Sequence, residues 1–227
     1  MNPLVSPKKI LRHRVFVVDD HPLVREWLGN LIKRRPDLEV CGQAEDAATA
    51  LAAMSDTLPH VVIVDLSLKG GSGLDLIKDL RVQHPSVGIL VLSMHEDASY
   101  AERALRAGAR GYVMKRESTG QIIDAIYDVL RGKIYASPNL LARLAERMVD
   151  EVAEKSVPMA ELLSDRELEV FRLFGGGLET RRIAERMSLS IKTVQCYAAR
   201  VKEKLHLDNA SELIREAVKW VETERRQ

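Results

Sequence analysis

The sequence predicts an α/β domain built from five βα units, (βα)5, followed by a smaller domain that is entirely helical. Two observations predict this division. Short apolar runs alternate with amphipathic segments up to about residue 131, and from residue 162 onward only helical patterns remain. Apolar runs of four or five mostly β-branched residues indicate strands that are buried on both faces, as in a parallel sheet. A chain of 227 residues is long enough for two domains with ordinary cores.

Four of the predicted strands end in a polar residue that can take part in chemistry. The run VFVVDD ends at Asp19 and Asp20, VVIVD at Asp65, GILVLS at Ser93 and GYVMK at Lys115. Residues 38–44 supply the remaining strand. Helical spacing follows each strand, and prolines separate helix from strand three times. The predicted helices span residues 23–35, 47–54, 74–83, 98–107 and 118–131, with the prolines at positions 36, 59 and 85.

The sequence divides into a domain at 1–133, a connector at 134–159 and a helical tail at 160–227. In the connector, Ser137 and Pro138 form a helix start that opens an amphipathic segment to about residue 154, interpreted as either a linker or a dimerisation helix. In the tail, Ser164 and Glu167 have capping-box spacing, and three glycines end that helix. The predicted tail helices begin at residues 165, 180, 190 and 210, and the last extends to about 221.

Composition excludes several classes of protein. The 34 basic and 33 acidic residues leave a net charge of +1, so the whole chain is not a polyelectrolyte. Its two cysteines, Cys41 and Cys196, fall in different predicted domains and support neither a disulfide framework nor a metal site. The basic N-terminus lacks the apolar core of a signal peptide, and no stretch approaches the roughly 20 apolar residues that span a bilayer. We therefore expect a cytoplasmic protein without membrane association.

The polar strand ends predict a phosphoryl and metal site. Because functional crevices in open α/β sheets lie at the carboxyl ends of strands, these side chains should meet there. Asp19, Asp20 and Asp65 would repel one another unless a cation lay between them, and oxygen ligands suit Mg²⁺. Lys115 and Ser93 could then contact phosphoryl oxygens. The alternative for each residue alone is a solvated strand end, but five such residues at one sheet edge argue against it.

Two enzyme classes are disfavoured by what surrounds Asp65. A phosphatase that uses a strand-end aspartate as its acceptor needs a second aspartate two residues on, where this chain has Ser67. The GGSG sequence at 70–73 resembles a phosphate cradle, but the string GxxxxGK followed by Ser or Thr is absent. We therefore predict that the protein is not an enzyme acting on an external substrate.

The tail contains a local basic strip. Between Arg181 and Lys204 the chain has seven basic and two acidic residues, a local charge of +5, which favours a phosphate-bearing partner. In the segment from Ser190, apolar residues at 194, 197, 198, 201 and 205 share one face. The opposite face carries small, hydrogen-bonding and basic residues that suit the major groove of double-stranded DNA. These residues are Lys192, Gln195, Cys196, Ala199 and Arg200; alone they would also fit an ordinary solvated face.

The strand-end residues, with Tyr112 three positions before Lys115, resemble the receiver domain of bacterial two-component response regulators, which has a flavodoxin-like fold. The resemblance implies that Asp65 accepts a phosphoryl group from a sensor histidine kinase. It also implies that Asp19 and Asp20, together with Asp65, hold Mg²⁺, that Lys115 contacts the phosphoryl group, and that Ser93 and Tyr112 form a switch pair. In this switch, Ser93 moves inward and leaves space for the Tyr112 ring.

The stretch LSDRELEVFRLFGGGLETRRIAERMSLSIKTVQCYAARVKEKLHL resembles the four-helix LuxR-type DNA-binding domain, and IAERMSLSIKTV matches its helix-turn-helix. Together the two resemblances imply a NarL/FixJ-type response regulator. They add Thr193 and Lys204 to the DNA-contacting set and imply a homodimer formed through Leu213 and Ala217 of the last helix. Gln195 stands where lysine is common and Arg182 where glutamate is usual, so base preference is not transferable.

The resulting prediction is a transcription factor that is switched by Mg²⁺-dependent phosphorylation of Asp65. Without phosphate the receiver is expected to cover the face from Lys192 to Arg200, and phosphorylation would expose that face and favour a dimer. The rival hypothesis is a constitutive DNA-binding protein whose receiver serves only as a protein-interaction module. The intact acidic set favours the switch, because such a module has no need of Asp65 and Lys115 together.

Overall fold

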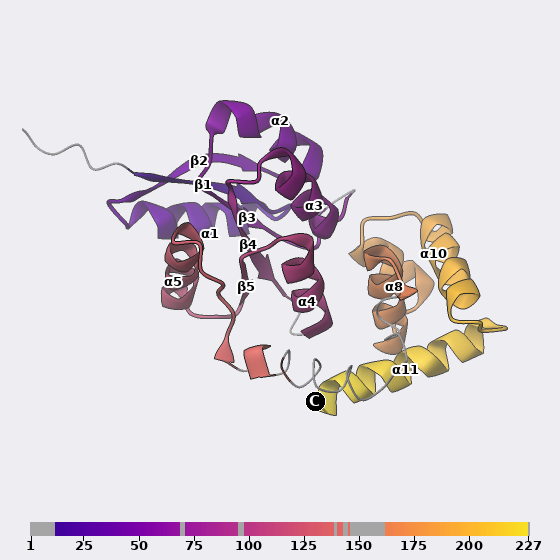
Figure 1. Cartoon of the computed structure of the whole chain (residues 1–227). Coiled ribbons are helices and arrows are strands. Elements are labelled where there is room, and N and C mark those ends of the chain that lie inside the picture. Colours follow the sequence, from indigo (N-terminus) through magenta and orange to yellow (C-terminus); the bar gives the residue numbers. More distant parts are fainter. Residues whose placement is uncertain are drawn as a thin grey trace, which may run out of the picture.

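The computed structural model describes residues 12–68, 71–94, 98–138, 140–142, 145 and 162–226. Two domains are evident, an α/β domain and a helical tail, and helix α8 (Asp165–Gly175) of the tail lies on the side nearer to the α/β domain (Figure 1). The predicted fold class is confirmed. In the described part of the chain, no helix is long and apolar enough to cross a membrane.

The α/β domain is organised around a parallel sheet whose strands are ordered β2-β1-β3-β4-β5. Strands β1, β3 and β4 are short and mostly buried, as their continuous apolar runs predict, whereas the edge strand β2 is mostly half-buried. Because all of them run in the same direction, their carboxyl ends lie along one edge of the sheet. The strands are β1 (His13–Val18), β2 (Leu38–Ala44), β3 (Val61–Val64), β4 (Gly88–Ser93) and β5 (Gly111–Met114).

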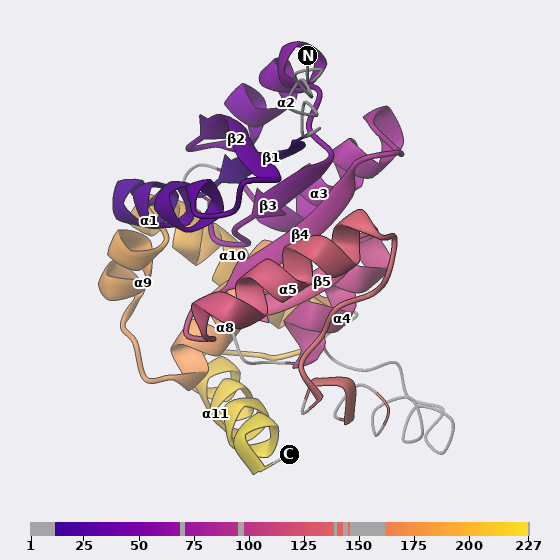
Figure 2. The ribbon, with the colours of Figure 1, turned by 90° about the vertical axis from the view of Figure 1, so that its left-hand side faces the viewer.

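Helices cover both faces of this sheet and form two separate cores. Helices α1 (Pro22–Lys33) and α5 (Thr119–Leu130) pack on one face, the near side in Figure 2. Helices α2 (Ala47–Thr57), α3 (Gly73–Gln83) and α4 (Ala98–Ala107) pack on the other face. Successive strand residues alternate between the two cores, which explains why whole runs are apolar.

The tail consists of α8 (Asp165–Gly175), α9 (Thr180–Arg186), α10 (Ile191–Lys204) and α11 (Ala210–Arg226). The predicted capping box is present at the start of α8, and Ser190 caps α10. Gly175 is required by a close approach, since a Cβ there would lie 2.3 Å from the carbonyl oxygen of Ala217 in α11. Helix α11 continues past residue 221, where it was expected to end.

Ser137 caps the start of the connector helix, because the Leu140 amide donates to its hydroxyl at 3.3 Å, but most of residues 137–154 lie outside the described residues.

The predicted dimer contact through Leu213 and Ala217 is wrong. Both residues are buried inside the tail, where α11 packs on α8, and they offer no surface to a partner.

Candidate functional site

The carboxyl edge of the sheet brings together the residues that the sequence singled out. Asp19 follows β1, Asp65 follows the adjacent strand β3, and Lys115 follows β5, which is separated from β3 by β4. The Lys115 ammonium lies 2.7 Å from Asp19 Oδ2 and 2.7 Å from Asp65 Oδ2. Asp19 and Asp65 are only 2% and 3% exposed. One buried cation is therefore shared between two buried carboxylates.

Burial controls the electrostatics of this cluster. Desolvation raises the pKa of Asp65, the Asp19 charge adds to this increase, and Lys115 opposes it. For Lys115, burial alone would lower the pKa, but the charges of Asp65 and Asp19 outweigh burial and raise it. The site thus holds more negative charge than Lys115 neutralises, and a further cation would be stabilised there.

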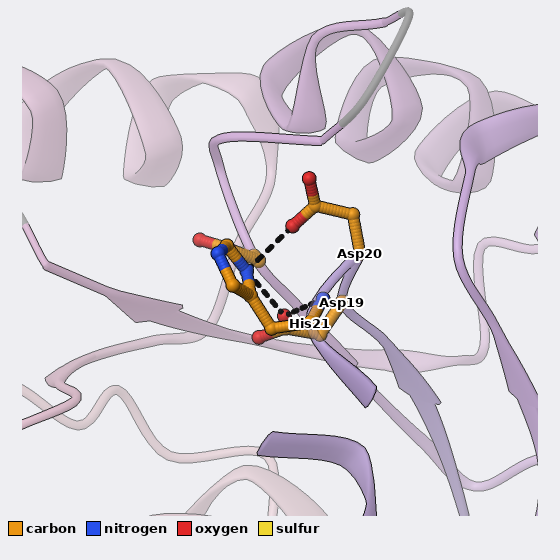
Figure 3. Close-up of side chains that lie close together, drawn as sticks. Asp19, Asp20 and His21 are labelled. Carbon is orange, nitrogen blue, oxygen red and sulfur yellow. Dashed lines mark hydrogen bonds and ion pairs between the residues drawn. The ribbon is translucent and has the colours of Figure 1, made fainter. Parts of the chain in front are cut away.

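A divalent cation fits the donor set. Asp19, Asp20, His21 and Asp65 each offer a ligand atom, and these atoms lie within 4.8 Å of one another. The His21 ring approaches Asp20 Oδ1 at 2.7 Å and Asp19 Oδ1 at 3.2 Å (Figure 3). The buried oxygens Asp19 Oδ2 and Asp20 Oδ1 each have an ion-pair partner at 2.7 Å, Lys115 and His21, but within the described part of the chain neither accepts a well-directed hydrogen bond. A set of ligand atoms that are mostly oxygens and still have unused lone pairs is suited to Mg²⁺.

Sequence reasoning missed His21. Its position directly after the Asp19-Asp20 pair was the available signal, because a residue at the start of α1 remains at the same edge of the sheet. The imidazole is largely exposed, and the His21 amide donates to Asp19 Oδ1 at 2.8 Å. This hydrogen bond orients the Asp19 carboxylate toward the cluster.

The predicted switch pair lies on neighbouring strands. Ser93 ends β4 and is fully buried, and the Lys115 amide donates to its carbonyl oxygen at 2.8 Å. Tyr112 lies in β5, pairs with Val91 of β4 and is also buried, at 1% exposure. The Tyr112 ring is therefore already buried in this structure and does not have to move inward from a solvent-exposed position.

Position 73, in the loop that follows Asp65, requires a glycine for structural reasons. A Cβ at this position would lie 2.2 Å from the backbone oxygen of Asp65. The Gly73 amide donates to the Leu66 carbonyl at 3.0 Å, which closes the loop against the start of α3. The glycine in GGSG thus lets the chain fold tightly around the acidic site.

The second predicted site is the free face of α10. Val194 and Val201 are buried in the tail core, and the predicted apolar face is confirmed. The residues on the opposite face are all exposed, so the expectation that the receiver covers this face is wrong for this conformation: Lys192, Gln195, Cys196, Ala199 and Arg200. Thr193 lies at the edge of this surface, half-buried, with its hydroxyl 2.7 Å from that of Ser190.

Lys204 differs from the rest of the predicted DNA-contacting set. Its ammonium lies 2.6 Å from Glu167 Oε2, and Glu167 is buried in the tail. Lys204 therefore joins the end of α10 to the start of α8 through an ion pair. Any contact of Lys204 with a phosphate would have to share its charge with this carboxylate.

Two sequence families match the chain and agree with this geometry. Residues 15–127 match the response regulator receiver domain, and residues 161–217 match the bacterial regulatory proteins of the luxR family. The oxygen regulatory protein NreC of Staphylococcus epidermidis is 33% identical, over 91% of this chain and 97% of its own length. The chain is a LuxR-family response regulator. It is also similar to DegU of Brevibacillus brevis, at 29% identity over 97% of this chain and 99% of DegU.

Solved structures of response regulators share this architecture. RcsB of Salmonella typhimurium aligns with a TM-score of 0.62 and 27% identity, over 92% of this chain and 98% of RcsB. A LuxR-family regulator from Aurantimonas sp. SI85-9A1 is 36% identical, with a TM-score of 0.58 over 61% of this chain and 99% of its own. This protein is thus a DNA-binding regulator of the two-component class, and its relatives are transcriptional regulators, not enzymes.

In this response regulator the receiver and the tail contact each other directly through the start of α8. Arg103 of α4 donates to Asp165 Oδ1 at 2.5 Å and to the Leu163 carbonyl at 2.7 Å. Arg166 donates to the carbonyl of Leu68 at 3.1 Å and to that of Gly71. Both carbonyls belong to the loop that follows Asp65, so the tail touches the loop next to the acidic cluster.

The interdomain contact was missed by sequence reasoning. In the sequence, Asp165 and Arg166 are recognisable only as part of a helix start, and Arg103 belongs to no motif. No periodicity or motif pairs residues about 60 or 95 positions apart, so only the tertiary structure reveals these contacts.

Proposed function

We propose that the regulator is switched by phosphorylation of Asp65 by a sensor histidine kinase, in a reaction that depends on Mg²⁺. The observation that carries this proposal is the buried Asp65–Lys115–Asp19 cluster, in which a carboxylate, a cation and a metal-binding pair meet at one edge of the sheet. Transfer forms a P–O bond at an Asp65 oxygen and breaks the P–N bond to the histidine of the kinase. Mg²⁺, when bound, neutralises charge on the phosphoryl oxygens.

The residues of the chain have distinct roles in this reaction. Asp19, Asp20 and Asp65 would hold Mg²⁺, and His21 lies within reach as a further ligand. The Lys115 ammonium, which now pairs with Asp65, would move to a phosphoryl oxygen as the carboxylate becomes an acyl phosphate.

Ser93 and Tyr112 are the remaining residues of the proposed receiver machinery. Ser93 is buried at the end of β4 and would donate its hydroxyl to the new phosphoryl group. Tyr112 is already buried, so we propose that the adjustment of Ser93 repacks its surroundings without an inward swing of the ring.

The tail would bind double-stranded DNA through α10. Gln195 can pair with an adenine edge, Cys196 and Ala199 can pack on a thymine methyl, and Lys192 and Arg200 can contact phosphates. RcsB has been solved bound to promoter DNA in the presence of the phosphomimetic BeF₃⁻, and as dimers on DNA. We propose the same mode here, with a homodimer reading two half-sites.

Phosphorylation would act on the contact between the domains. Arg166 binds carbonyls of the loop beside Asp65, so a change in that loop reaches α8 directly. An aspartyl phosphate adds about one further negative charge and extra acceptor oxygens at this point. We propose that the repacked loop loosens Arg166 and Asp165 and lets the tail dimerise on DNA.

A mass measurement tests whether Asp65 is phosphorylated and whether the reaction requires Mg²⁺. Wild type and Asp65→Asn are incubated with a small phosphodonor, with and without Mg²⁺, and their intact masses are determined. We expect a single phosphoryl adduct on wild type that requires Mg²⁺ and is absent from Asp65→Asn. An adduct that survives the substitution would overturn the assignment of Asp65.

DNA affinity then tests the switch. The exposed face of α10 favours a second candidate, a constitutive DNA-binding protein whose receiver serves as an interaction module. The switch predicts tighter DNA binding by phosphorylated wild type than by Asp65→Asn under the same conditions. Equal affinity in all four samples, with and without phosphodonor, would establish the constitutive alternative.

Base reading is tested on the tail with a matched pair of variants. Gln195→Ala should cost about 1–3 kcal/mol at cognate sites and little elsewhere, if the side chain reads a base. Lys192→Ala should weaken binding to all sequences and reduce the dependence of affinity on salt. The measurement is fluorescence anisotropy on cognate and scrambled duplexes over a range of salt concentrations. If the two variants behaved alike, Gln195 would have no role in specificity.

A further inference from the structure

A cleft of about 790 Å³ lies between the two domains. Helices α3 and α4 of the receiver form one wall, and the start of α8 together with α10 forms the other. Its volume lies within the range of about 300–1,000 Å³ that is typical of small-molecule sites. Neither the phosphorylation chemistry nor the proposed DNA contacts use this cleft as a whole.

The lining of the cleft is strongly cationic. Two carboxylates, Asp75 and Asp165, face a larger number of basic side chains from both domains. The basic residues are Lys78, Arg81, Arg103, Arg106, Arg166 and Arg200. A concentration of like charges in a recess focuses the potential and attracts anions.

Ion pairs within the described residues offset only part of this charge. Asp165 is shared, since it lies 2.5 Å from Arg103 and 3.6 Å from Lys78. Arg106 pairs with Glu102 at 2.6 Å, on the surface of α4. Arg81 donates to a backbone carbonyl, that of Pro85, which leaves its charge in place. Lys78 also lies 3.2 Å from Asp75, and Arg166 lies 2.8 Å from Glu169. The six basic side chains of the lining thus meet four carboxylates, those of Asp75, Asp165, Glu102 and Glu169, and positive charge remains in excess.

The rest of the lining is apolar and includes one aromatic ring. Leu74, Val82 and Leu163 contribute aliphatic surface, and Tyr197 of α10 contributes a half-buried ring. Arginine clusters bind phosphate groups through several charge-assisted hydrogen bonds, and an aromatic ring offers a stacking surface to a base. This combination fits a small polyanion that carries phosphates and a planar ring.

We propose that this interdomain cleft binds a phosphorylated small molecule of the nucleotide class. The phosphates contact Arg81, Arg106 and Arg200, and the ring lies against Tyr197. Both domains supply contacts, so the ligand stabilises the arrangement in which the receiver and the tail touch.

Binding in the cleft opposes DNA binding, a consequence that rests on the proposed role of α10. Arg200 lies both in the cleft and on the proposed DNA-contacting face, and one guanidinium cannot contact both phosphates. A ligand that favours one arrangement lowers the affinity for any partner that needs the other. The regulator would then respond to a metabolite as well as to phosphorylation.

The binding test uses the full-length protein without DNA or phosphodonor, so its outcome is independent of the proposed function. ATP and inorganic tripolyphosphate are titrated calorimetrically at low ionic strength. We expect one saturable site per chain, with tighter binding of ATP than of tripolyphosphate if the ring contributes. Equal affinities would assign the site to phosphate groups alone and overturn the nucleotide class.

Variants locate the site. Arg81→Gln combined with Arg106→Gln should weaken ATP binding by about tenfold, because two charged donors are lost. Arg131→Gln is the matched control, since Arg131 is exposed and paired with Asp128 much as Arg106 is exposed and paired with Glu102. Equal weakening in the control, or binding that is lost only with Lys192→Ala on the DNA-contacting face, would overturn the proposal. Circular dichroism confirms that each variant is folded.

Discussion

Helix α8 carries two acidic residues whose surroundings differ sharply although they are only two positions apart. Glu167 faces the tail, where it accepts hydrogen bonds from Lys204 at 2.6 Å and from the Ser164 amide at 2.8 Å. Burial alone would raise the pKa of Glu167, but these donors outweigh burial and lower it. Glu169 lies on the receiver side, where burial and the nearby Asp65 charge raise its pKa and Arg166 only partly offsets them.

The difference shows that one side of α8 stabilises the tail while the other side contacts the receiver. On the tail side the ionised carboxylate is well satisfied, so this side stabilises the domain. On the receiver side the Glu169 carboxylate pairs with Arg166 at 2.8 Å, but burial and the charge of Asp65 still disfavour its ionised form. A region that tolerates little additional negative charge is suited to respond to an aspartyl phosphate, whereas the tail side is suited to remain unchanged.

The largest expected effect is on the tail side. Glu167→Ala removes the capping box of α8 and leaves Lys204 without its carboxylate, so we expect the tail to lose about 2–3 kcal/mol of unfolding free energy. The measurement is denaturant unfolding of the full-length protein. The matched control is Glu222→Ala on the exposed part of α11, which should change stability by less than about 0.5 kcal/mol. Similar losses in both variants would show that the burial of Glu167 is unimportant.

Most of the secondary structure and of the acidic site could be predicted from the sequence. Strands that are buried on both faces leave a continuous apolar run, and polar residues at their ends must then lie at one edge of the sheet. This reasoning placed Asp19, Asp65 and Lys115 at the same edge, and the structure shows that ion pairs connect them there. The free face of α10 followed in the same way from helical spacing.

The contacts between the domains could not be predicted in this way. Charged residues such as Arg103 and Arg166 look the same in sequence whether they face water or another domain. Leu213 and Ala217 illustrate the same limit, since an apolar helix face fits the interior of its own domain as well as a dimer interface. Periodicity shows that a face is covered but does not identify what covers it.

A smaller effect is expected where α8 meets the receiver. Arg103→Gln removes the donors to Asp165 and Leu163, which weakens the interdomain contact by about 1–2 kcal/mol without disturbing either core. Unphosphorylated Arg103→Gln should therefore bind DNA several-fold more tightly than wild type, while the tail unfolds as before.

Arg106→Gln is the control for this prediction, because Arg106 lies one turn further along α4 and pairs with Glu102 of its own helix. DNA affinity by anisotropy and tail stability are measured on all three proteins. Unchanged DNA affinity in Arg103→Gln would mean that the contact between α4 and α8 does not restrain the tail.

The smallest expected effect is a change in pH dependence at Glu169. Its raised pKa means that the folded protein holds this proton more tightly than the unfolded chain does. The contribution of this proton to the unfolding free energy is fully present below the ordinary carboxyl pKa. It is lost as the pH rises through the raised pKa of Glu169 in the folded protein. Glu169→Gln removes the titrating group, so the variant should lose less stability than wild type over this range.

The size and the origin of this effect can both be measured. Unfolding of wild type and Glu169→Gln is compared between about pH 4 and pH 7, and we expect the unfolding free energy of wild type to fall more steeply as the pH rises. Because the Asp65 charge contributes to the raised pKa, the difference should shrink when both proteins also carry Asp65→Asn. A difference that is the same with and without Asp65→Asn would show that the charge of Asp65 does not affect Glu169. The receiver side of α8 would then be a passive contact, no more responsive to Asp65 than the tail side.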